Sequence, residues 1–372
     1  MAATSIDIII PSYRLEAQYL LPLLQLQRPA ATIIHYYVIA DNPAVVVAPA
    51  IQQLVNNDDI KLLINEHNLG AAVSRNKGID SGQADWILFL DDDIIVPPNL
   101  LETYAAAIQQ YPDATGFIGL VNLPPAQDAF TRAIQVSGSM DIFSIAQRKP
   151  AYAWGATANF LISRNAISDI RFSHAYPKAG GGEDVDFFLK VRAHNQYKDY
   201  QSLPAAAVLH PWWNQGRVNY KRPFRYGIGN SYLAALNPAY TYYDWLNTPE
   251  TLLLTMVAII IAGLLQPTAL PLFACLLAGI VVIECIATTV QAIKRRAPLQ
   301  PAVYVYLLLL RLSYETGVLW GNLARGRIKG FGERFNDNCR MNKLKFYRTS
   351  SYRITKWVLY LLLTWWLFTK FR

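Results

Sequence analysis

The sequence predicts an α/β domain, in which helices flank a sheet, followed by an α-helical membrane region. Three observations support this prediction. Apolar runs of strand length alternate with helical segments up to about residue 215, which is typical of a parallel sheet. Apolar residues are concentrated after Thr251. One apolar run, 87–90, leads directly into three carboxylates, Asp91 to Asp93.

The elements of the α/β domain follow from the hydrophobic pattern and the turn residues. Strands are expected at 6–10, 33–40, 60–64, 86–90, 115–121 and 158–162. Helices are expected at 15–27, 45–56, 71–81, 99–110 and 184–193. The stretch from 122 to about 150 is less regular, and residues 210–250 show no clear periodicity. We therefore expect one domain over 1–215, with 216–250 as a linker or acceptor-side segment.

The composition indicates a membrane part, because 53% of the 372 residues are hydrophobic and only 16% are charged. Residues 251–293 carry a single charge, Glu284, and predict a hairpin of two membrane helices that turns at 266–271. A third apolar run, 303–323, contains Arg311 and Glu315 and has basic flanks, which favours a re-entrant or interfacial segment. The last run, 357–369, is short and is expected in the interface. Residues 294–372 are thus predicted to be basic and partly interfacial or membrane-inserted.

The net charge of +8 comes largely from residues 325–356, which hold ten Lys or Arg and two acidic residues. Because apolar runs flank this stretch, we expect it to lie on an anionic membrane surface rather than on nucleic acid. The N-terminal run 6–10 is expected to be a strand, so we expect no signal peptide. We therefore expect the α/β domain on the cytoplasmic side of an inner or plasma membrane.

The three carboxylates at 91–93 would project from the carboxyl end of a buried strand, where ligands bind in open α/β sheets. Adjacent carboxylates repel one another unless a hard divalent cation shares their oxygens. The simplest interpretation is a Mg²⁺ or Mn²⁺ site that also holds a phosphate. The alternative is a solvated acidic turn.

Five segments in chain order resemble the inverting glycosyltransferases of family 2. They are 8–14 (IIIPSYR), 65–78 (NEHNLGAAVSRNKG), 89–93 (FLDDD), 155–160 (GATANF) and 182–187 (GEDVDF). The resemblance covers roughly residues 5–215 and implies the GT-A fold of nucleotide-diphospho-sugar transferases, with a mixed sheet and flanking helices. It also implies transfer of a sugar from a nucleotide-diphosphate donor with Mn²⁺ or Mg²⁺.

The resemblance implies separate roles for the carboxylates. Asp93 becomes the first metal ligand and Asp91 a donor ligand, while Asp92 helps either one or is a solvated bystander. Asp184 looks like the base that deprotonates the acceptor, although it could be an ordinary helix N-cap. Glu183 and Asp186 are the fallback candidates for the base.

Further positions match the donor site of the family. His210 resembles a histidine that completes the metal shell, or it is structural. Pro11 and Tyr13 follow the first strand, where Tyr13 would stack on the nucleoside base, and Asp41 would accept a hydrogen bond from that base. Trp212 and the adjacent Trp213 could form an acceptor platform or interfacial anchors.

The loop before the predicted helix 71–81 also belongs to the expected donor site. Asn68 and Gly70 would approach the donor, or only shape the turn. Arg75 would offer a guanidinium to the diphosphate. Further basic candidates, for the diphosphate or for lipid headgroups, are Arg217, Lys221, Arg222 and Arg225, whose default interpretation is a solvated basic face.

The chain departs from the processive family members, which carry a Gln-x-x-Arg-Trp motif after the base. Here Gln215 and Arg217 stand at another spacing and no Trp follows. We therefore expect non-processive transfer to a lipid-linked or membrane-proximal glycan, as in polysaccharide biosynthesis. One alternative is a polyprenyl-phosphate glycosyltransferase, whose acceptor is the lipid phosphate. Another is a non-catalytic membrane scaffold with a degenerate nucleotide-binding domain.

Overall fold

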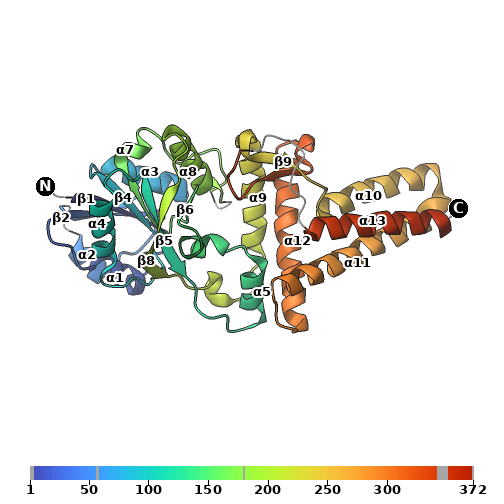
Figure 1. Ribbon diagram of the computed structural model, residues 1–372, viewed down its shortest axis with the longest axis horizontal. Coiled ribbons are helices and arrows are strands. Elements are labelled where there is room, and N and C mark those ends of the chain that lie inside the picture. Colours follow the sequence, from blue (N-terminus) through green and yellow to red (C-terminus); the bar gives the residue numbers. More distant parts are fainter. Residues whose placement is uncertain (1–3, 56–57, 179–180, 342–350, 371–372) are drawn as a thin grey trace. The chain divides into compact units, whose positions relative to one another are not determined.

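The computed structural model of the chain describes residues 4–55, 58–178, 181–341 and 351–370 (Figure 1). The chain divides into two compact units, of which the first comprises 1–125 and 140–216 and the second 126–139 and 217–372. The first unit thus ends near the predicted domain boundary but omits a short internal segment. The functional division of the chain into four regions stays a prediction.

The first unit is built on an eight-stranded sheet with the order β3-β2-β1-β4-β7-β5-β8-β6. Its strands are β1 (Thr4–Ser12), β2 (Thr32–Ala40), β3 (Ile60–Ile64), β4 (Trp86–Leu90), β5 (Gly116–Asn122), β6 (Ala151–Tyr152), β7 (Asn159–Ser163) and β8 (Tyr200–Leu209). β1 to β4 pair in parallel, whereas β7 runs antiparallel to β4 and β5, and β6 antiparallel to β8. The mixed sheet confirms the predicted fold class, while the hydrophobic pattern alone indicated parallel strands.

Helices cover both faces of this sheet. They are α1 (Ala17–Leu24), α2 (Pro49–Leu54), α3 (Ala71–Ser81), α4 (Leu100–Gln110), α6 (Ile145–Arg148), α7 (Arg164–Ile167) and α8 (Glu183–His194). Ile8 and Ile10 of β1 belong to the core shared with α1 and α4, whereas Ile9 faces the core shared with α3 and α8. This alternation follows from the two-residue period of a strand and leaves the carboxyl ends of β1, β2 and β4 free to form a site.

Two segments whose sequences are less regular or show no clear periodicity nevertheless contain helices. Within 122–150 the chain forms α5 (Ala129–Ser137), which begins at a capping box between Asp128 and Thr131. Within 210–250 it forms α9 (Lys221–Leu236). Glycines at 227 and 229 weaken the helical signal of α9, and a Cβ on Gly227 would collide with the carbonyl of Tyr314. The close approach of another helix therefore requires a glycine at 227, and the same glycine makes α9 difficult to predict from the sequence.

The second unit contains α5, α9, four long helices and a two-stranded sheet. The long helices are α10 (Thr248–Leu265), α11 (Leu270–Lys294), α12 (Pro301–Leu323) and α13 (Ser351–Lys370). By length and composition, α10, α11 and α12 could each cross a membrane. Residues 251–293, predicted to form a hairpin of two membrane helices, contain α10 and α11 with the turn at Pro267–Ala269, and their insertion into a membrane stays a prediction.

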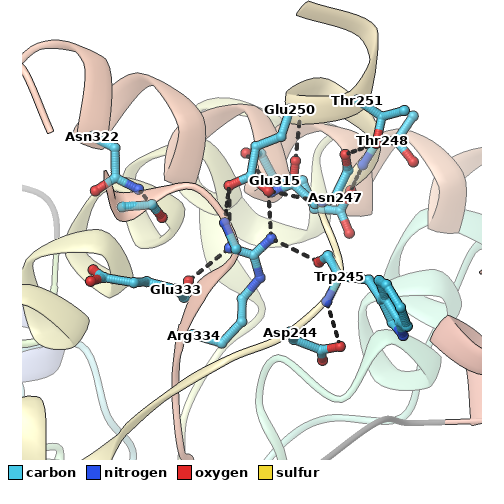
Figure 2. Close-up of polar contacts among 12 residues, drawn as sticks. Asp244, Trp245, Asn247, Thr248, Glu250, Thr251, Glu315, Asn322, Glu333 and Arg334 are labelled. Carbon is cyan, nitrogen blue, oxygen red and sulfur yellow. Dashed lines mark hydrogen bonds and ion pairs between the residues drawn. The ribbon is translucent and has the colours of Figure 1, made fainter. Parts of the chain in front are cut away.

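Buried ion pairs hold the second unit together. Arg334 in β10 (Glu333–Phe335), which pairs with β9 (Thr241–Tyr243), lies 2.6 Å from the Glu250 carboxylate at the start of α10 (Figure 2). Asn247 caps the same helix by accepting the Glu250 N–H, and Glu250 accepts the Asn247 N–H in return. Because both charges are nearly fully buried, removing either one would leave the other uncompensated.

Candidate active site

Two aspartates and a histidine meet at the carboxyl end of β4. One potential ligand atom from each of Asp91, Asp93 and His210 lies within 4.8 Å of the others. His210 Nε2 is 3.5 Å from Asp93 Oδ1 and 3.9 Å from Asp91 Oδ2. β4 presents the aspartates, and His210 follows β8. The structure thus brings together the two predicted metal ligands, together with Asp91, which was predicted as a donor ligand.

The orientation of His210 suits metal binding. Its backbone N–H donates to the Asn122 carbonyl at 2.9 Å, and its Nδ1 lies 2.6 Å from the Pro211 carbonyl. A carbonyl oxygen can only accept a hydrogen bond, so Nδ1 donates to it and Nε2 is the ring nitrogen that faces the carboxylates and could bind a metal. Two carboxylates and a neutral imidazole form a donor set that fits Mn²⁺ or Mg²⁺.

Asp92 faces a different partner from its two neighbours. The Ser12 hydroxyl, at the end of β1, donates to Asp92 Oδ2 at 2.5 Å and accepts the Leu15 N–H at 3.0 Å. Burial raises the pKa of the Asp92 carboxyl to about 6, and the bond from Ser12 opposes that shift. Ser12 was not predicted as a site residue, although its position at the end of the strand next to β4 was a usable signal.

Arg75 of α3 connects the end of β4 to the start of α8. Its Nη2 is 3.7 Å from Asp91 Oδ1, and its Nη1 is 3.4 Å from Glu183 Oε1. The guanidinium also lies 5.5 Å from the ring centre of Phe172. Arg75 is 6% exposed, and its Nε has no hydrogen-bond partner among the residues that the structure describes. A buried cation held by two carboxylates is well placed to meet an additional anion.

Two adjacent carboxyls open α8 after Gly182, whose φ of +99° lies in the left-handed region that favours glycine. Burial raises the pKa of both carboxyls, and that of Glu183 reaches about 7, although the nearby Arg75 guanidinium acts to lower both. Asp184 Oδ1 accepts the Val185 N–H at 2.8 Å. A carboxyl with a raised pKa near neutrality is suited to proton transfer.

The fallback candidate Asp186 has a separate partner. It is buried on α8 and lies 2.6 Å from Lys190 Nζ, one turn further along the helix. This ion pair gives Asp186 a role within the helix. Its place as a base candidate stays a prediction.

The loop between β3 and α3 is held by Asp41. Its carboxylate accepts the N–H groups of Leu69 and Gly70, each at 2.8 Å, and the Asn65 amide at 2.9 Å. Gly70 has a φ of +89° and begins α3, so it has a structural reason to be glycine. Asn68 is exposed, and its carbonyl accepts from the Lys178 ammonium at 2.9 Å. Asp41 thus shapes the loop that leads to Arg75, and its predicted contact with a nucleoside base stays a prediction.

The remaining predicted residues fall into two groups. In the first unit, Pro11 lies in β1, and Tyr13, just beyond that strand, is 54% exposed. Trp212 is buried, and its Nε1 donates a hydrogen bond to the Pro125 carbonyl at 3.4 Å. The basic candidates Arg217, Lys221, Arg222 and Arg225 belong to the second unit. Their contribution to this site therefore stays a prediction.

Sequence comparison places the first unit among known proteins. Residues 7–171 match the family described as Glycosyl transferase family 2. A protein of Haemophilus influenzae described as an uncharacterized glycosyltransferase is 29% identical over 196 residues, which is 53% of this chain and 65% of that protein. A glucosyl-dolichyl phosphate glucuronosyltransferase of Haloferax volcanii is 36% identical over 64 residues, which is 17% of this chain and 20% of that protein. The chain therefore spans less than two thirds of either relative.

Solved glycosyltransferase structures are more distant. The mannosyltransferase PcManGT of Pyrobaculum calidifontis, in complex with GDP-Man and Mn²⁺, is 15% identical, has a TM-score of 0.49 and aligns over 83% of this chain and 86% of its own. Residues 1–349 of S. aureus TarS, in complex with UDP-GlcNAc, are 14% identical, with a TM-score of 0.43 over 92% of this chain and 100% of that one. These likenesses are too distant to assign a substrate.

Proposed function

We propose that this chain, whose residues 7–171 match the family described as Glycosyl transferase family 2, transfers a sugar from a nucleotide-diphosphate donor to an acceptor hydroxyl with inversion. The group formed by Asp91, Asp93 and His210 carries the proposal. It lies at the carboxyl end of β4, where α/β sheets bind ligands, and Arg75 links it to the carboxyls at the start of α8.

The donor diphosphate would lie at this group. Asp93 and His210 would hold a divalent cation, which supplies charge stabilisation to the leaving diphosphate. Arg75 already lies beside Asp91, and its guanidinium would donate hydrogen bonds to phosphate oxygens or to the donor sugar. Pro11, Tyr13 and the loop held by Asp41 would contact the nucleoside, with Tyr13 stacking on the base.

The acceptor would be activated from the start of α8. Inversion requires the acceptor oxygen to attack the anomeric carbon opposite the leaving group, and the oxygen must lose its proton as it attacks. Asp184 would take that proton. Its raised pKa makes it a stronger base than an exposed aspartate once it is ionised.

The acceptor is proposed to be a lipid-linked or membrane-proximal glycan, and transfer is proposed to be non-processive. The apolar helices of the second unit support attachment to a membrane, with the first unit on the cytoplasmic side. The name of the Haloferax volcanii relative also refers to a glucosyl-dolichyl phosphate. A lipid phosphate is the alternative acceptor, and it would need no base.

The proposal is tested with purified protein and a panel of nucleotide sugars with UDP and GDP carriers. We expect metal-dependent transfer or hydrolysis of one donor. Asp93→Asn and Asp184→Asn should each abolish transfer, whereas Asp169→Asn, at an exposed turn of the same unit, should not.

The outcomes separate the alternatives. Full activity of either active-site variant would contradict the assigned roles. Retained activity of Asp184→Asn alone, with polyprenyl phosphate as acceptor, would favour the lipid-phosphate reaction. No metal-dependent nucleotide binding in calorimetry would favour a non-catalytic scaffold.

A further inference from the structure

The long helices of the second unit differ in how they meet one another, and this difference bears on which of them enter a membrane. α13 packs along α11 in the antiparallel sense. Lys356 of α13 lies 2.9 Å from the Glu284 carboxylate of α11. Further along, a Cβ on Gly279 of α11 would collide with Leu363 of α13. Toward the C-terminus, α13 therefore approaches the turn between α10 and α11, as Figure 1 also shows.

Helices α10, α11 and α13 form a three-helix bundle, and its polar contacts lie at one level along the helix axes. Glu284 accepts hydrogen bonds from Thr248 at the start of α10 and from Tyr352 at the start of α13, as well as from Lys356. Beyond this level, residues 251–265 of α10, 270–283 of α11 and 357–369 of α13 contain no Asp, Glu, Lys or Arg. The bundle thus has one polar end and one apolar body.

The apolar body is exposed and has a length close to that of a membrane span. Leu264 is 80% exposed, Leu361 70% and Trp365 67%. From the polar level, α11 and α13 each continue for about 21 Å and α10 for about 25 Å, at about 1.5 Å per residue. The hydrocarbon core of a bilayer is about 30 Å thick, and a bilayer thins locally around shorter spans.

The far end of α13 favours a complete crossing over insertion into one leaflet. Trp365 and Trp366 precede Lys370 at the end of the helix. Tryptophans are enriched at membrane interfaces, and a lysine in the hydrocarbon core is costly. Both residue types are accommodated if this end reaches the opposite surface.

α12 meets the bundle in another way, although its composition would allow a span. Its two central charged residues contact the polar end of the bundle: Arg311 lies 3.9 Å from the ring centre of Tyr352, and Glu315 accepts the Thr248 N–H at 3.1 Å. A spanning α12 would place both charges near the middle of the hydrocarbon core. In Figure 1, α12 crosses the ends of α10, α11 and α13 instead of running beside them.

α9 covers α12 along part of its length. A Cβ on Gly317 would collide with the carbonyl of Phe224, and one on Gly321 with the hydroxyl of Ser231. The Ser313 hydroxyl also donates to the Tyr220 carbonyl at 2.6 Å. α9 and α12 therefore form a closely packed pair whose backbones touch.

We infer that α10, α11 and α13 are the three membrane-spanning helices of this chain, and that α12 lies with α9 at the membrane surface. A lipid bilayer is the partner of the exposed apolar surface of α10, α11 and α13. The C-terminal end of α13 then lies on the opposite side of the membrane from residues 298 and 329, which flank α12. This inference rests on the proposed membrane attachment and not on sugar transfer.

Cysteine accessibility in sealed membrane vesicles of known orientation tests this topology. Cys275, Cys285 and Cys339 are replaced by Ala in the full chain, and single cysteines are introduced by Pro298→Cys, Lys329→Cys, Thr268→Cys and Lys370→Cys. A membrane-impermeant maleimide should label 298 and 329 from one face, and 268 and 370 only from the other. Reporter fusions after residue 372 give a second measurement that does not depend on the cysteine variants.

Each outcome is decisive. Labelling of 298 and 329 from opposite faces would show that α12 spans, and labelling of 370 or 268 from the same face as 298 would show that α13 or the hairpin does not. Either result overturns the inference. If the protein does not sediment with membranes at all, the proposed attachment itself fails.

Discussion

The adjacent carboxyls at the start of α8 allow a prediction with a defined pH dependence. Burial raises the pKa of Glu183 from 4.5 to about 7 despite the nearby Arg75. Raising the pKa of this carboxyl from 4.5 to about 7 corresponds to about 3 kcal/mol of stability. A carboxyl whose pKa is raised by folding contributes its full stability below about pH 4.5 and loses it as the pH rises through about 7.

Glu183→Gln removes the buried charge and keeps the shape of the side chain. At pH 5 the glutamate is largely protonated in the folded protein, so the variant and the wild type should have similar stability. At pH 8 the variant should be more stable by up to about 3 kcal/mol. For a unit of about 200 residues this corresponds to a melting temperature about 6 to 12 °C higher.

The assay is thermal unfolding of the detergent-solubilised full chain with a chelator, followed by tryptophan fluorescence at pH 5 and pH 8. Glu66→Gln, in an exposed loop of the same unit, is the control and should show no pH-dependent gain. The two carboxyls interact, so the proton belongs to the pair, and Asp184→Asn should also be more stable than the wild type at pH 8, because burial raises the pKa of Asp184 as well. A Glu183→Gln variant less stable than the wild type at pH 8 would contradict this prediction and would mean that the ion pair with Arg75 outweighs the cost of burial.

Three further predictions concern the metal group, the donor loop and the helix pair. His210→Ala should weaken Mn²⁺ binding at least about tenfold in a calorimetric titration, and unchanged affinity would exclude His210 as a ligand. Gly70→Ala should cost about 1–2 kcal/mol, because an alanine at a φ of +89° is strained and its Cβ would lie 3.2 Å from Lys178 Cβ. Denaturant unfolding measures that loss, and an equally stable variant contradicts it. Gly317→Leu should separate α9 from α12 and increase proteolysis within 217–250. Gly326→Ala is the control, because a Cβ at 326 meets nothing within 4 Å, although φ there is +64°. It should leave the cleavage pattern unchanged.

Local sequence pattern was sufficient for much of the first unit. β3, β4 and α3 have the predicted bounds. The strands are apolar runs of strand length and the helix is flanked by Gly70 and Gly82, so their bounds depend only on residues nearby in the chain. The antiparallel direction of β7 was not predictable from periodicity, since a buried strand has the same apolar pattern in either direction. α5 and α9 pack on α12, which lies far away in the sequence, and the glycines that permit this close approach weaken the helical signal of α9.

The same distinction applies to the candidate site. Asp91, Asp93 and His210 follow strands that end at one edge of the sheet, so the pattern and the family resemblance together indicated their proximity. The link from Asp91 through Arg75 to Glu183 joins three segments far apart in the chain. The bond from Ser12 to Asp92 depends on the order of β1 and β4 in the sheet. Such contacts depend on tertiary geometry, which local patterns do not contain.

The most direct test of the account is calorimetric binding of nucleotide-diphosphate sugars to the wild type and to Asp93→Asn, with and without Mn²⁺. We predict that one donor binds the wild type only when the metal is present, and that Asp93→Asn loses this binding while its melting temperature without metal stays close to that of the wild type. Metal-independent binding, or unchanged metal-dependent binding by Asp93→Asn, would contradict the assignment of the site.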